Sequence, residues 1–363
     1  MIVKGDNVTF EHCDMNFVTK HGFIHAAEMA LEFKSKYNHP FICDTDQLAG
    51  FFGRPTGKVF HIVRNSDSMY NSVSIPKKSG GYRELHVPNA ELKYYQRKIL
   101  RGVLDFLPMS EYATAYRIGT KLAHNACPHI GHKYLLKLDI TDFFGSITFA
   151  QVYSAAFNTK YFPKQIGAML TTLCCFEDVL PQGAPSSPAL SNIVMKNFDD
   201  SFGAWCKEKG FEYTRYCDDI TVSGNDKLYP AFRKAKSKLE AMGFEINEKK
   251  THLITNANRQ SVTGITANEK LSISSDYKRK LRQEIHYVLK YGAENVIKRN
   301  NLTEYITDNA IDCERYEQHL LGKINYVLSI EKNNSWFADA KFNLQNERQY
   351  YAARKRLEYF YVM

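Results

Sequence analysis

Residues 215–224 read Arg215-Tyr216-Cys217-Asp218-Asp219-Ile220-Thr221-Val222-Ser223-Gly224, and the rest of the chain is organised around this stretch. Two adjacent carboxylates lie between short runs of aromatic and β-branched residues, which are typical of strands. Because neighbouring side chains on a strand point to opposite faces, only a tight turn lets both carboxylates serve one site. The stretch therefore predicts a β-hairpin with Asp218 and Asp219 at its tip.

An Asp-Asp pair is also common in ordinary surface turns, so the pair alone does not identify a site. A cation between the two aspartates would relieve their mutual repulsion. A further carboxylate supports this interpretation, because the apolar strand predicted from residue 134 ends at Asp139. A carboxylate at the end of a buried strand is unfavourable unless it is paired or bound to a metal. Asp139 is therefore the candidate third ligand beside Asp218 and Asp219.

A basic hairpin is predicted across 70–88, where two strand-like runs flank the turn Lys77-Lys78-Ser79-Gly80-Gly81. Its lysines, together with Arg83, suit the binding of phosphates. A solvated hairpin tip is the alternative for so short a cluster of charges.

Further along, helix-like sequence runs through 148–176, and Leu180-Pro181-Gln182-Gly183 begins a rigid turn that leads into another helix. Backbone N–H groups of this turn, with Gln182, could contact a nucleotide or a template base, although a plain helix-entry loop is the alternative. From about residue 271 the chain is predicted to be helical and basic, with its cations mostly off an apolar stripe.

Composition limits the function classes. The net charge of +9 over 363 residues favours a polyanionic partner, although moderate basicity alone is weak evidence. The eight cysteines include no C-x-x-C pair, which favours reduced thiols, and the histidines at 124, 129 and 132 lack the further ligands of a zinc site. Without a signal-peptide pattern or an apolar run of about 18 residues, we expect a cytoplasmic protein with no membrane association.

The order of the motifs resembles the reverse transcriptases over about residues 70–270. The basic hairpin is followed by Asp-x-x-Asp-Phe-Phe at 139–144, Leu-Pro-Gln-Gly at 180–183, Tyr-x-Asp-Asp at 216–219 and Gly-Phe-x-x-x-x-x-Lys-Thr at 243–251. The sequence departs from the usual pattern at Gly145, where proline is frequent, and at Cys217, which is commonly alanine. Neither departure removes a carboxylate.

Two further segments resemble signatures of the bacterial retron reverse transcriptases. One is Asn-Ala-Cys-Pro-His at 125–129, which the sequence predicts to be a polar loop, and the other is Val-Thr-Gly at 262–264. A structural role for the first segment is at least as plausible as direct contact with RNA.

The resemblance implies an α+β fold of the right-hand polymerase type. Residues 1–60 would form an N-terminal helical extension and 61–130 the fingers. A palm of antiparallel sheet and helices would cover 131–270, with a finger segment near 150–180, and 271–363 would form a helical thumb and a tail.

The resemblance also implies the site. The catalytic residues would be Asp139, Asp218 and Asp219, holding two Mg²⁺ ions roughly 3.5–4 Å apart, with Mn²⁺ as a possible substitute. The implied nucleotide-binding residues are Lys78 (or Lys77), Arg83, the steric gate Phe144, Gln182 and Lys250 (or Lys249). The implied RNA-contacting or signature residues are Asn125, His129, Val262, Thr263, Gly264, Lys278, Lys280 and Arg282.

Retron enzymes copy a cognate structured noncoding RNA with dNTPs, priming from a guanosine 2′-hydroxyl, and yield multicopy single-stranded DNA within an RNA–DNA hybrid. By resemblance we expect the same here, with a role in antiphage defence, an effector protein encoded nearby and a host ribonuclease H to remove template. The alternatives are another bacterial reverse transcriptase of the defence or abortive-infection type, and a catalytically inactive RNA-binding scaffold. Phe144 and the Tyr-Cys-Asp-Asp sequence disfavour an RNA-dependent RNA polymerase.

Overall fold

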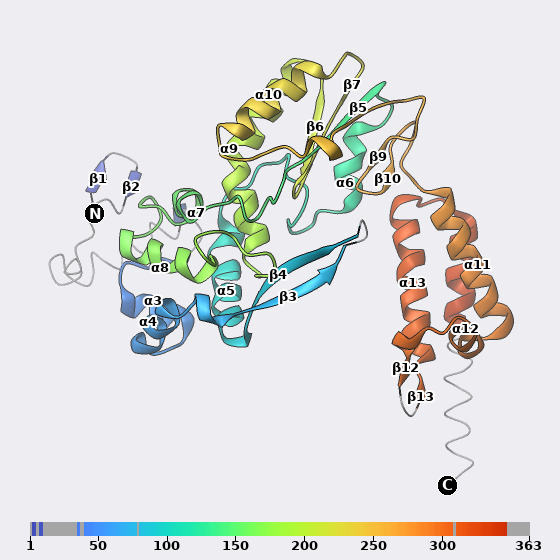
Figure 1. The fold of residues 1–363 in the computed structure, drawn as a ribbon, viewed down its shortest axis with the longest axis horizontal. Helices are drawn as coiled ribbons and strands as arrows, with labels where there is room; N and C mark the ends of the chain where they lie inside the picture. The colour runs from blue at the N-terminus through green and yellow to red at the C-terminus, as the bar shows by residue number, and fades with distance from the viewer. Residues whose placement is uncertain are drawn as a thin grey trace, which may run out of the picture. The chain divides into compact units, whose positions relative to one another are not determined.

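The computed structural model describes residues 40–77, 80–307 and 310–346, together with 35–36 and the backbone of 2–4 and 7–9. The chain divides into two units (Figure 1). The first comprises Met1–Thr120 and Tyr134–Leu253, and the second comprises Lys121–Lys133 and Ile254–Met363. Both combine helices with antiparallel strand pairs, which confirms the α+β class.

A four-stranded sheet has the order β6-β7-β5-β8, and its strands β6, β7 and β5 belong to the first unit. Its strands β6 and β7 form the predicted hairpin, in which Tyr216 pairs with Asp219 across a two-residue turn. The predicted apolar strand is β5, and its last residue, Asp139, pairs with Asp219. The bounds are Tyr134–Asp139 for β5, Glu212–Tyr216 for β6, Asp219–Gly224 for β7 and His252–Thr255 for β8.

The two faces of this sheet differ in polarity because side chains alternate along each strand. Leu138 and Ile220 are neighbours across β5 and β7 and are buried in the core of the unit. The opposite face presents Asp139 beside Asp219. The long helix α9 (Ser187–Glu208) contacts β6 and supports the buried face (Figure 1). The sheet therefore separates an apolar core from an acidic site.

Helices surround this core. The stretch 148–176, expected to be helix-like, forms two helices rather than one. Proline would disrupt the interior of a single helix, but Pro163 is tolerated at the N-cap of the second helix, where its missing N–H is not needed. The helix that follows the Leu-Pro-Gln-Gly turn is α9, as predicted. The remaining bounds are α3 Thr45–Phe52, α4 Thr56–Arg64, α5 Ala90–Gly102, α7 Phe149–Ala156, α8 Lys164–Cys174 and α10 Tyr229–Glu240, with short 3₁₀ helices at Asp67–Met69, Leu104–Phe106 and Glu248–Lys250.

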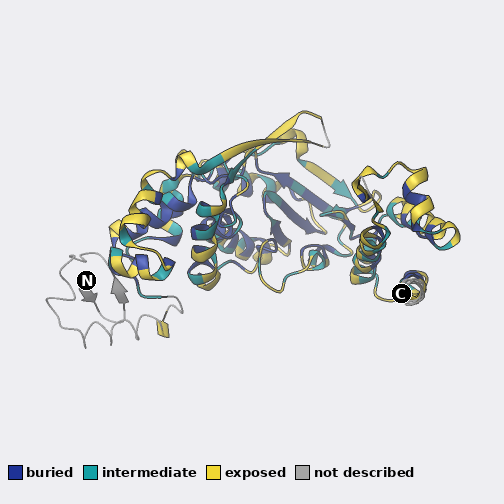
Figure 2. Cartoon of the chain, turned by 90° about the horizontal axis from the view of Figure 1, so that it is seen from below, coloured by how far each residue is buried: buried dark blue, intermediate teal, exposed yellow. Residues whose placement is uncertain are grey.

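The predicted basic hairpin is formed by β3 (Tyr70–Pro76) and β4 (Tyr82–Pro88), with Ile75 opposite Arg83. Most residues of both strands are exposed, in contrast with the dark-blue buried residues of the sheet and its helices (Figure 2). Lys77 and Arg83 are exposed. Lys78, the predicted triphosphate ligand, lies outside the described residues.

The second unit combines short strands with long amphipathic helices. The predicted apolar stripe of α11 is buried at Leu281, Ile285 and Val288, because it packs against the helices α12 and α13. Its strands form a three-stranded sheet of order β11-β10-β9 and a separate pair, β12-β13. The bounds are α6 Leu122–Ala126, β9 Ser261–Val262, β10 Ile265–Thr266, β11 Ser272–Ile273, α11 Ser275–Tyr291, α12 Ala293–Arg299, β12 Ile306–Thr307, β13 Ala310–Ile311, α13 Cys313–Ile330 and a helix at 335–346, with 3₁₀ helices at Cys127–His129 and Thr303–Tyr305.

Near the N-terminus, β1 (Ile2–Lys4) pairs antiparallel with β2 (Asn7–Thr9). The rest of the predicted helical extension before residue 35 lies outside the described residues, and α3 and α4 follow it. Among the described helices, none is long and apolar enough to span a membrane.

Candidate active site

Three carboxylates gather where β5, β6 and β7 meet. Asp139 and Asp219 are directly opposite each other on antiparallel strands, so their side chains leave the same face of the sheet. Asp218 occupies the two-residue turn with Cys217, whose φ of 59° is left-handed. The Ile140 N–H donates to the Asp218 carbonyl (3.1 Å), which ties the turn to the chain just beyond β5. The turn thus places Asp218 beside Asp219, which lies opposite Asp139.

The site is short of positive charge. Burial raises the pKa of the Asp219 carboxyl above its ordinary value, and the neighbouring Asp218 and Asp139 raise it further. Lys137 and Lys250 lower it only in part. A bound cation would relieve this repulsion, which is the electrostatic condition for metal binding by carboxylates.

Lys250 provides a cation at Asp139. Its Nζ lies 2.9 Å from Oδ1 and 3.0 Å from Oδ2 of Asp139, which is 8% exposed. Within the described residues, no three ligating side chains already converge on one point. The carboxylate oxygens nevertheless match the hard ligands that Mg²⁺ and Mn²⁺ prefer. The residues therefore fit a divalent cation, with the Lys250 ammonium partly neutralising Asp139 in this arrangement.

The two aromatic residues after Asp139 have different environments. Phe143 is 3% exposed and packs in the core, with its ring 5.9 Å from that of Phe244. Phe144 is only half-buried, and its ring lies 5.4 Å from that of Phe143. Of the two rings, therefore, only that of Phe144, five residues after Asp139 in the chain, is partly accessible.

The Leu-Pro-Gln-Gly turn lies against the basic hairpin. Gly183 has a φ of 121°, and a Cβ at this position would come within 3.0 Å of the His86 carbonyl on β4. Glycine is therefore needed for the close approach of the two backbones. Gln182, its neighbour, is half-buried at this junction.

Tyr116 contacts the turn between β6 and β7, and no local sequence pattern predicts this contact. Its hydroxyl donates to the Cys217 Sγ (3.5 Å), and its ring lies 6.4 Å from that of Tyr216. Burial raises the pKa of the Cys217 thiol to about 12, so this thiol is neutral. The contact joins positions that are 101 residues apart, which no local pattern could predict.

The two segments at 125–129 and 262–264 meet inside the second unit. Asn125 Nδ2 donates to Thr263 Oγ1 (3.4 Å). Thr263 and Gly264 have φ values of 46° and 84°, which make a type I′ turn between β9 and β10. Burial, and then His132, lower the pKa of His129 to about 3.

The expectation of a polar loop at 125–129 was wrong, because this segment is helical. It covers the end of α6 and a 3₁₀ turn, and it lies against β9 and β10. Asn125 is 1% exposed, and His129 and Val262 are 0% exposed. These three side chains therefore support the turn, and only its tip is accessible to a partner.

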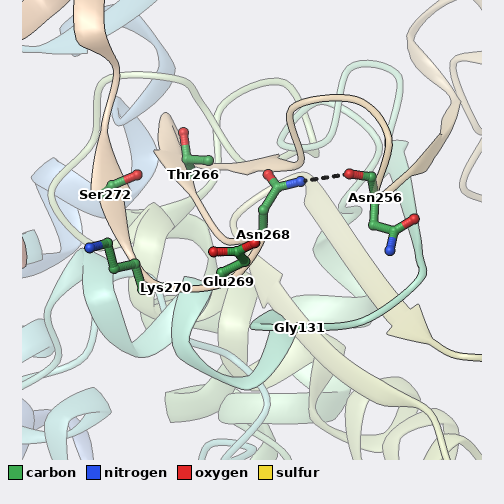
Figure 3. Close-up of a pocket in the computed structure, with 7 residues that line it drawn as sticks. All are labelled: Gly131, Asn256, Thr266, Asn268, Glu269, Lys270 and Ser272. Carbon is green, nitrogen blue, oxygen red and sulfur yellow. Dashed lines mark hydrogen bonds between the residues drawn. The ribbon is translucent and has the colours of Figure 1, made fainter.

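A polar pocket of about 340 Å³ lies in the second unit beside the β9–β10 hairpin (Figure 3). Asn268 donates to the Asn256 carbonyl at its rim (3.2 Å). None of the predicted site residues lines it. Its lining residues are Gly131, Asn256, Thr266, Asn268, Glu269, Lys270 and Ser272.

The three basic residues predicted on α11 differ in their surroundings. Lys278 is half-buried and forms an ion pair with Glu331 (2.7 Å). Lys280 and Arg282 are exposed, and the Arg282 guanidinium lies 5.4 Å from the ring of Trp336. Lys278 therefore belongs to the internal packing of the unit, and the other two form its accessible basic surface.

Carboxylates at the ends of two central strands, on one face of the sheet, with a basic hairpin in the same unit, are typical of metal-dependent enzymes that transfer phosphoryl or nucleotidyl groups. A family model described as reverse transcriptase (RNA-dependent DNA polymerase) matches residues 75–288. The retron Mx65 reverse transcriptase of Myxococcus xanthus is 32% identical over 81% of this chain and 70% of its own length. The retron Ec86 and Ec83 reverse transcriptases of Escherichia coli are 32% and 36% identical over 62% and 58% of this chain, in each case 72% of the relative. The chain therefore belongs to the reverse transcriptases, as an RNA-directed DNA polymerase of the bacterial retron type.

Among solved structures, the chain aligns with telomerase from Candida albicans in complex with a fragment of telomeric RNA, with 12% identity and a TM-score of 0.41 over 76% of this chain and 59% of that chain. An apo telomerase from Candida tropicalis gives 11% identity and a TM-score of 0.40 over 58% of this chain and 55% of that chain.

Proposed function

We propose that this enzyme works as a right-hand polymerase whose catalytic residues are Asp139, Asp218 and Asp219. The observation that carries the proposal is the pairing of Asp139 with Asp219 on one face of the sheet, with Asp218 in the adjoining turn. In this proposal the sheet is the palm, the β3–β4 hairpin belongs to the fingers, and the helices from α11 onward form the thumb.

The three aspartates would hold two Mg²⁺ ions, for which Mn²⁺ could substitute. When bound, such ions lower the pKa of a primer hydroxyl and neutralise the charge of the triphosphate and the leaving pyrophosphate. Lys250 would release Asp139 when the site fills and approach the pyrophosphate. Both lysines are exposed, but Lys250 already contacts the Asp139 carboxylate, which supports Lys250 rather than Lys249 in this role.

The incoming dNTP would lie between the carboxylates and the basic hairpin. Arg83, with Lys77 or Lys78, would bind its triphosphate, and Gln182 would line its site. The half-buried ring of Phe144 would exclude a ribose 2′-hydroxyl. The exposure of Lys77 and Arg83 and the fixed approach of Gly183 to β4 support this assignment.

Replacing Phe144 by alanine should increase the use of ribonucleotides relative to deoxynucleotides by roughly 10- to 100-fold. The upper value is about the discrimination against an added hydroxyl that a pocket reaches by shape alone. Single-nucleotide incorporation with dNTP and rNTP pairs measures the ratio. Phe143→Leu is the matched control, because Phe143 packs in the core and its loss should lower stability without changing the ratio. An unchanged ratio in Phe144→Ala would remove the gate assignment.

We further propose that the template is a cognate structured noncoding RNA. Synthesis would start from a guanosine 2′-hydroxyl and yield multicopy single-stranded DNA within an RNA–DNA hybrid. The similarity to three retron enzymes supports this proposal, as does the contact between Asn125 and Thr263, which links both retron-like segments. A role in antiphage defence with an effector protein, and template removal by a host ribonuclease H, complete the proposal.

The decisive experiment is to purify the protein from cells with its bound nucleic acid and to sequence that material. A small RNA joined covalently to DNA, and released by a 2′–5′ debranching enzyme, is the expected result. DNA without such a branch, in a preparation that synthesises DNA, would contradict this priming and favour another bacterial reverse transcriptase. An Asp218→Asn preparation controls for nucleic acid that binds without being synthesised.

The thumb would follow the RNA–DNA duplex through its phosphates rather than its base edges. Lys280→Gln should therefore weaken RNA binding about equally for all sequences and reduce the salt dependence of log K by about one. Titrations of RNA binding at several salt concentrations measure both effects. Lys278→Gln is the matched control, because it breaks the ion pair with Glu331 and should lower stability without changing the salt dependence. If both variants changed the salt dependence alike, the distinction between the two lysines would be wrong.

A further inference from the structure

A buried ion pair lies on the core side of the sheet, beneath the catalytic turn. Arg215 on β6 and Asp199 on α9 both have side chains that are 0% exposed. The guanidinium donates to both carboxylate oxygens, from Nε at 2.8 Å and from Nη2 at 2.6 Å. Burial alone would lower the pKa of Arg215, but Asp199 holds it above its ordinary value. The arginine is therefore a permanent, fixed cation.

The same guanidinium reaches two further groups. Its Nη1 donates to the Cys217 carbonyl in the catalytic turn (2.9 Å). Its Nη2 donates to Asn192 Oδ1, and Asn192 lies five residues after the start of α9. The Arg215 guanidinium thus connects the turn to α9, the helix that follows the Leu-Pro-Gln-Gly motif. It can bond several groups at once because its five N–H donors are held in a fixed planar arrangement.

The turn needs an anchor of this kind. Cys217 has a φ of 59°, a left-handed conformation that is unfavourable for a non-glycine residue. Such a conformation persists only where surrounding contacts hold it. The Cys217 carbonyl is bonded to Arg215 on the core side, and the next residue is Asp218. Loss of this bond would let the turn relax to other backbone angles, and the direction of the Asp218 side chain depends on those angles.

Arg215 itself points away from the carboxylates. It pairs with Ile220, which pairs with Leu138, and these positions lie on the buried face of the sheet. Asp139 and Asp219 lie on the other face. Arg215 therefore cannot touch a substrate or a metal ion on the acidic face, and any effect on the reaction must pass through the groups that it holds, of which the Cys217 carbonyl is next to Asp218.

We propose that Arg215, held by Asp199, is a positioning residue that fixes the Cys217 carbonyl and so orients Asp218 for metal binding. The proposal rests on the proposed role of the three aspartates as metal ligands. It assigns a catalytic consequence to a buried ion pair that would otherwise serve stability alone. In other metal sites, residues that orient a ligand affect metal affinity or activity by about 10–100-fold.

The test uses Arg215→Lys in the 363-residue chain. Lysine keeps the charge beside Asp199, but one ammonium on a flexible stem cannot reach Asp199, Asn192 and the Cys217 carbonyl together. Binding of Mn²⁺ alone, followed by electron paramagnetic resonance, should weaken about tenfold or more. DNA synthesis should require correspondingly more Mn²⁺, and the melting temperature of each variant is measured alongside.

The matched control is Gln96→Leu on α5, which removes another fully buried polar side chain and its hydrogen bonds to Tyr70 and the Leu173 carbonyl. Its melting temperature should fall while its Mn²⁺ affinity stays that of the wild type. The inference would be overturned if Arg215→Lys and the wild type bound Mn²⁺ with equal affinity. It would also be overturned if both variants lost Mn²⁺ affinity in proportion to their fall in melting temperature.

If Arg215→Lys does not fold, Asp199→Asn gives the same test, because an amide accepts from only one guanidinium nitrogen through its single oxygen. Weaker Mn²⁺ binding in folded Asp199→Asn supports the positioning role, and wild-type binding refutes it. If the wild type copies RNA and binds Mn²⁺, and the variant binds Mn²⁺ equally well, then the positioning role of Arg215 is refuted and the proposed role of the aspartates is not. A wild-type protein that fails to bind Mn²⁺ would refute the proposed role of the aspartates, and the inference with it.

Discussion

Replacing Asp218 by asparagine is expected to lower DNA synthesis by roughly 10³-fold or more, with RNA binding almost unchanged. The substitution keeps the size of the side chain but removes a negative charge that the proposed metal ions require. RNA binding should persist because it depends on phosphate contacts elsewhere in the chain. Primer extension on a defined template measures the first effect, and a filter-binding titration measures the second.

Asp226→Asn is the matched control for this prediction. Asp226 is exposed and lies just beyond β7, at the end of this strand that is remote from the catalytic turn. Its replacement makes the same change in net charge, so it controls for effects of overall charge on nucleic-acid binding. Substantial DNA synthesis by Asp218→Asn, or equal losses in the two variants, would remove Asp218 from the catalytic residues.

The elements that position the carboxylates could be predicted because local patterns determine them. The predicted apolar strand ends at Asp139 in the structure, and the predicted hairpin turns between Tyr216 and Asp219. A two-residue turn fixes its own register, and a strand with one buried face can pair in only one of two neighbouring registers. The alternation therefore predicts that Asp139 and Asp219 share a face once the two strands are neighbours, and the structure shows that they are directly opposite.

Contacts between distant residues could not be predicted in this way. Arg215 stood in the stretch that decided the interpretation, yet its partner Asp199 is on a different element and is also fully buried. One signal was present: Asp199 follows Phe198 and precedes Phe202 on the apolar side of a helix, where an isolated carboxylate is unfavourable. A buried acid at such a position implies a buried base, but it does not say which one.

The basic residues of α11 also differ in ways that the sequence does not show. Lys278, Lys280 and Arg282 all lie mostly off the apolar stripe, but Lys278 has a partner, Glu331, that is 53 residues away. Only the packing of the helices determines that Lys278 faces inward and is paired. Similarly, Asn125 and His129 are polar in sequence and buried in the structure, because β9 and β10 lie against their segment.

The second large effect is expected at Asp199, whose replacement by alanine should lower the free energy of unfolding by about 3–5 kcal/mol. Removing the carboxylate leaves the Arg215 guanidinium as an uncompensated charge with no exposed surface. It also leaves the buried Tyr213 hydroxyl without the acceptor to which it donates (2.6 Å). Urea unfolding followed by the fluorescence of Trp205, which lies on the same helix, measures the change. A Trp336→Phe background leaves Trp205 as the single tryptophan of the chain.

Asp200→Ala, at the next position of the same helix, separates burial from charge. Asp200 forms an ion pair with Lys196, but its side chain is 43% exposed, so water can replace that contact. Its removal should change the free energy of unfolding by only about 0–1 kcal/mol. The two adjacent aspartates carry the same charge on the same helix. They differ in their partners: after removal of the aspartate, water can hydrate Lys196, which is partly exposed, but not Arg215, which is fully buried. Losses of similar size at both positions would mean that the buried pair contributes no more than a surface pair, and that Arg215 finds solvent or another acceptor when Asp199 is absent.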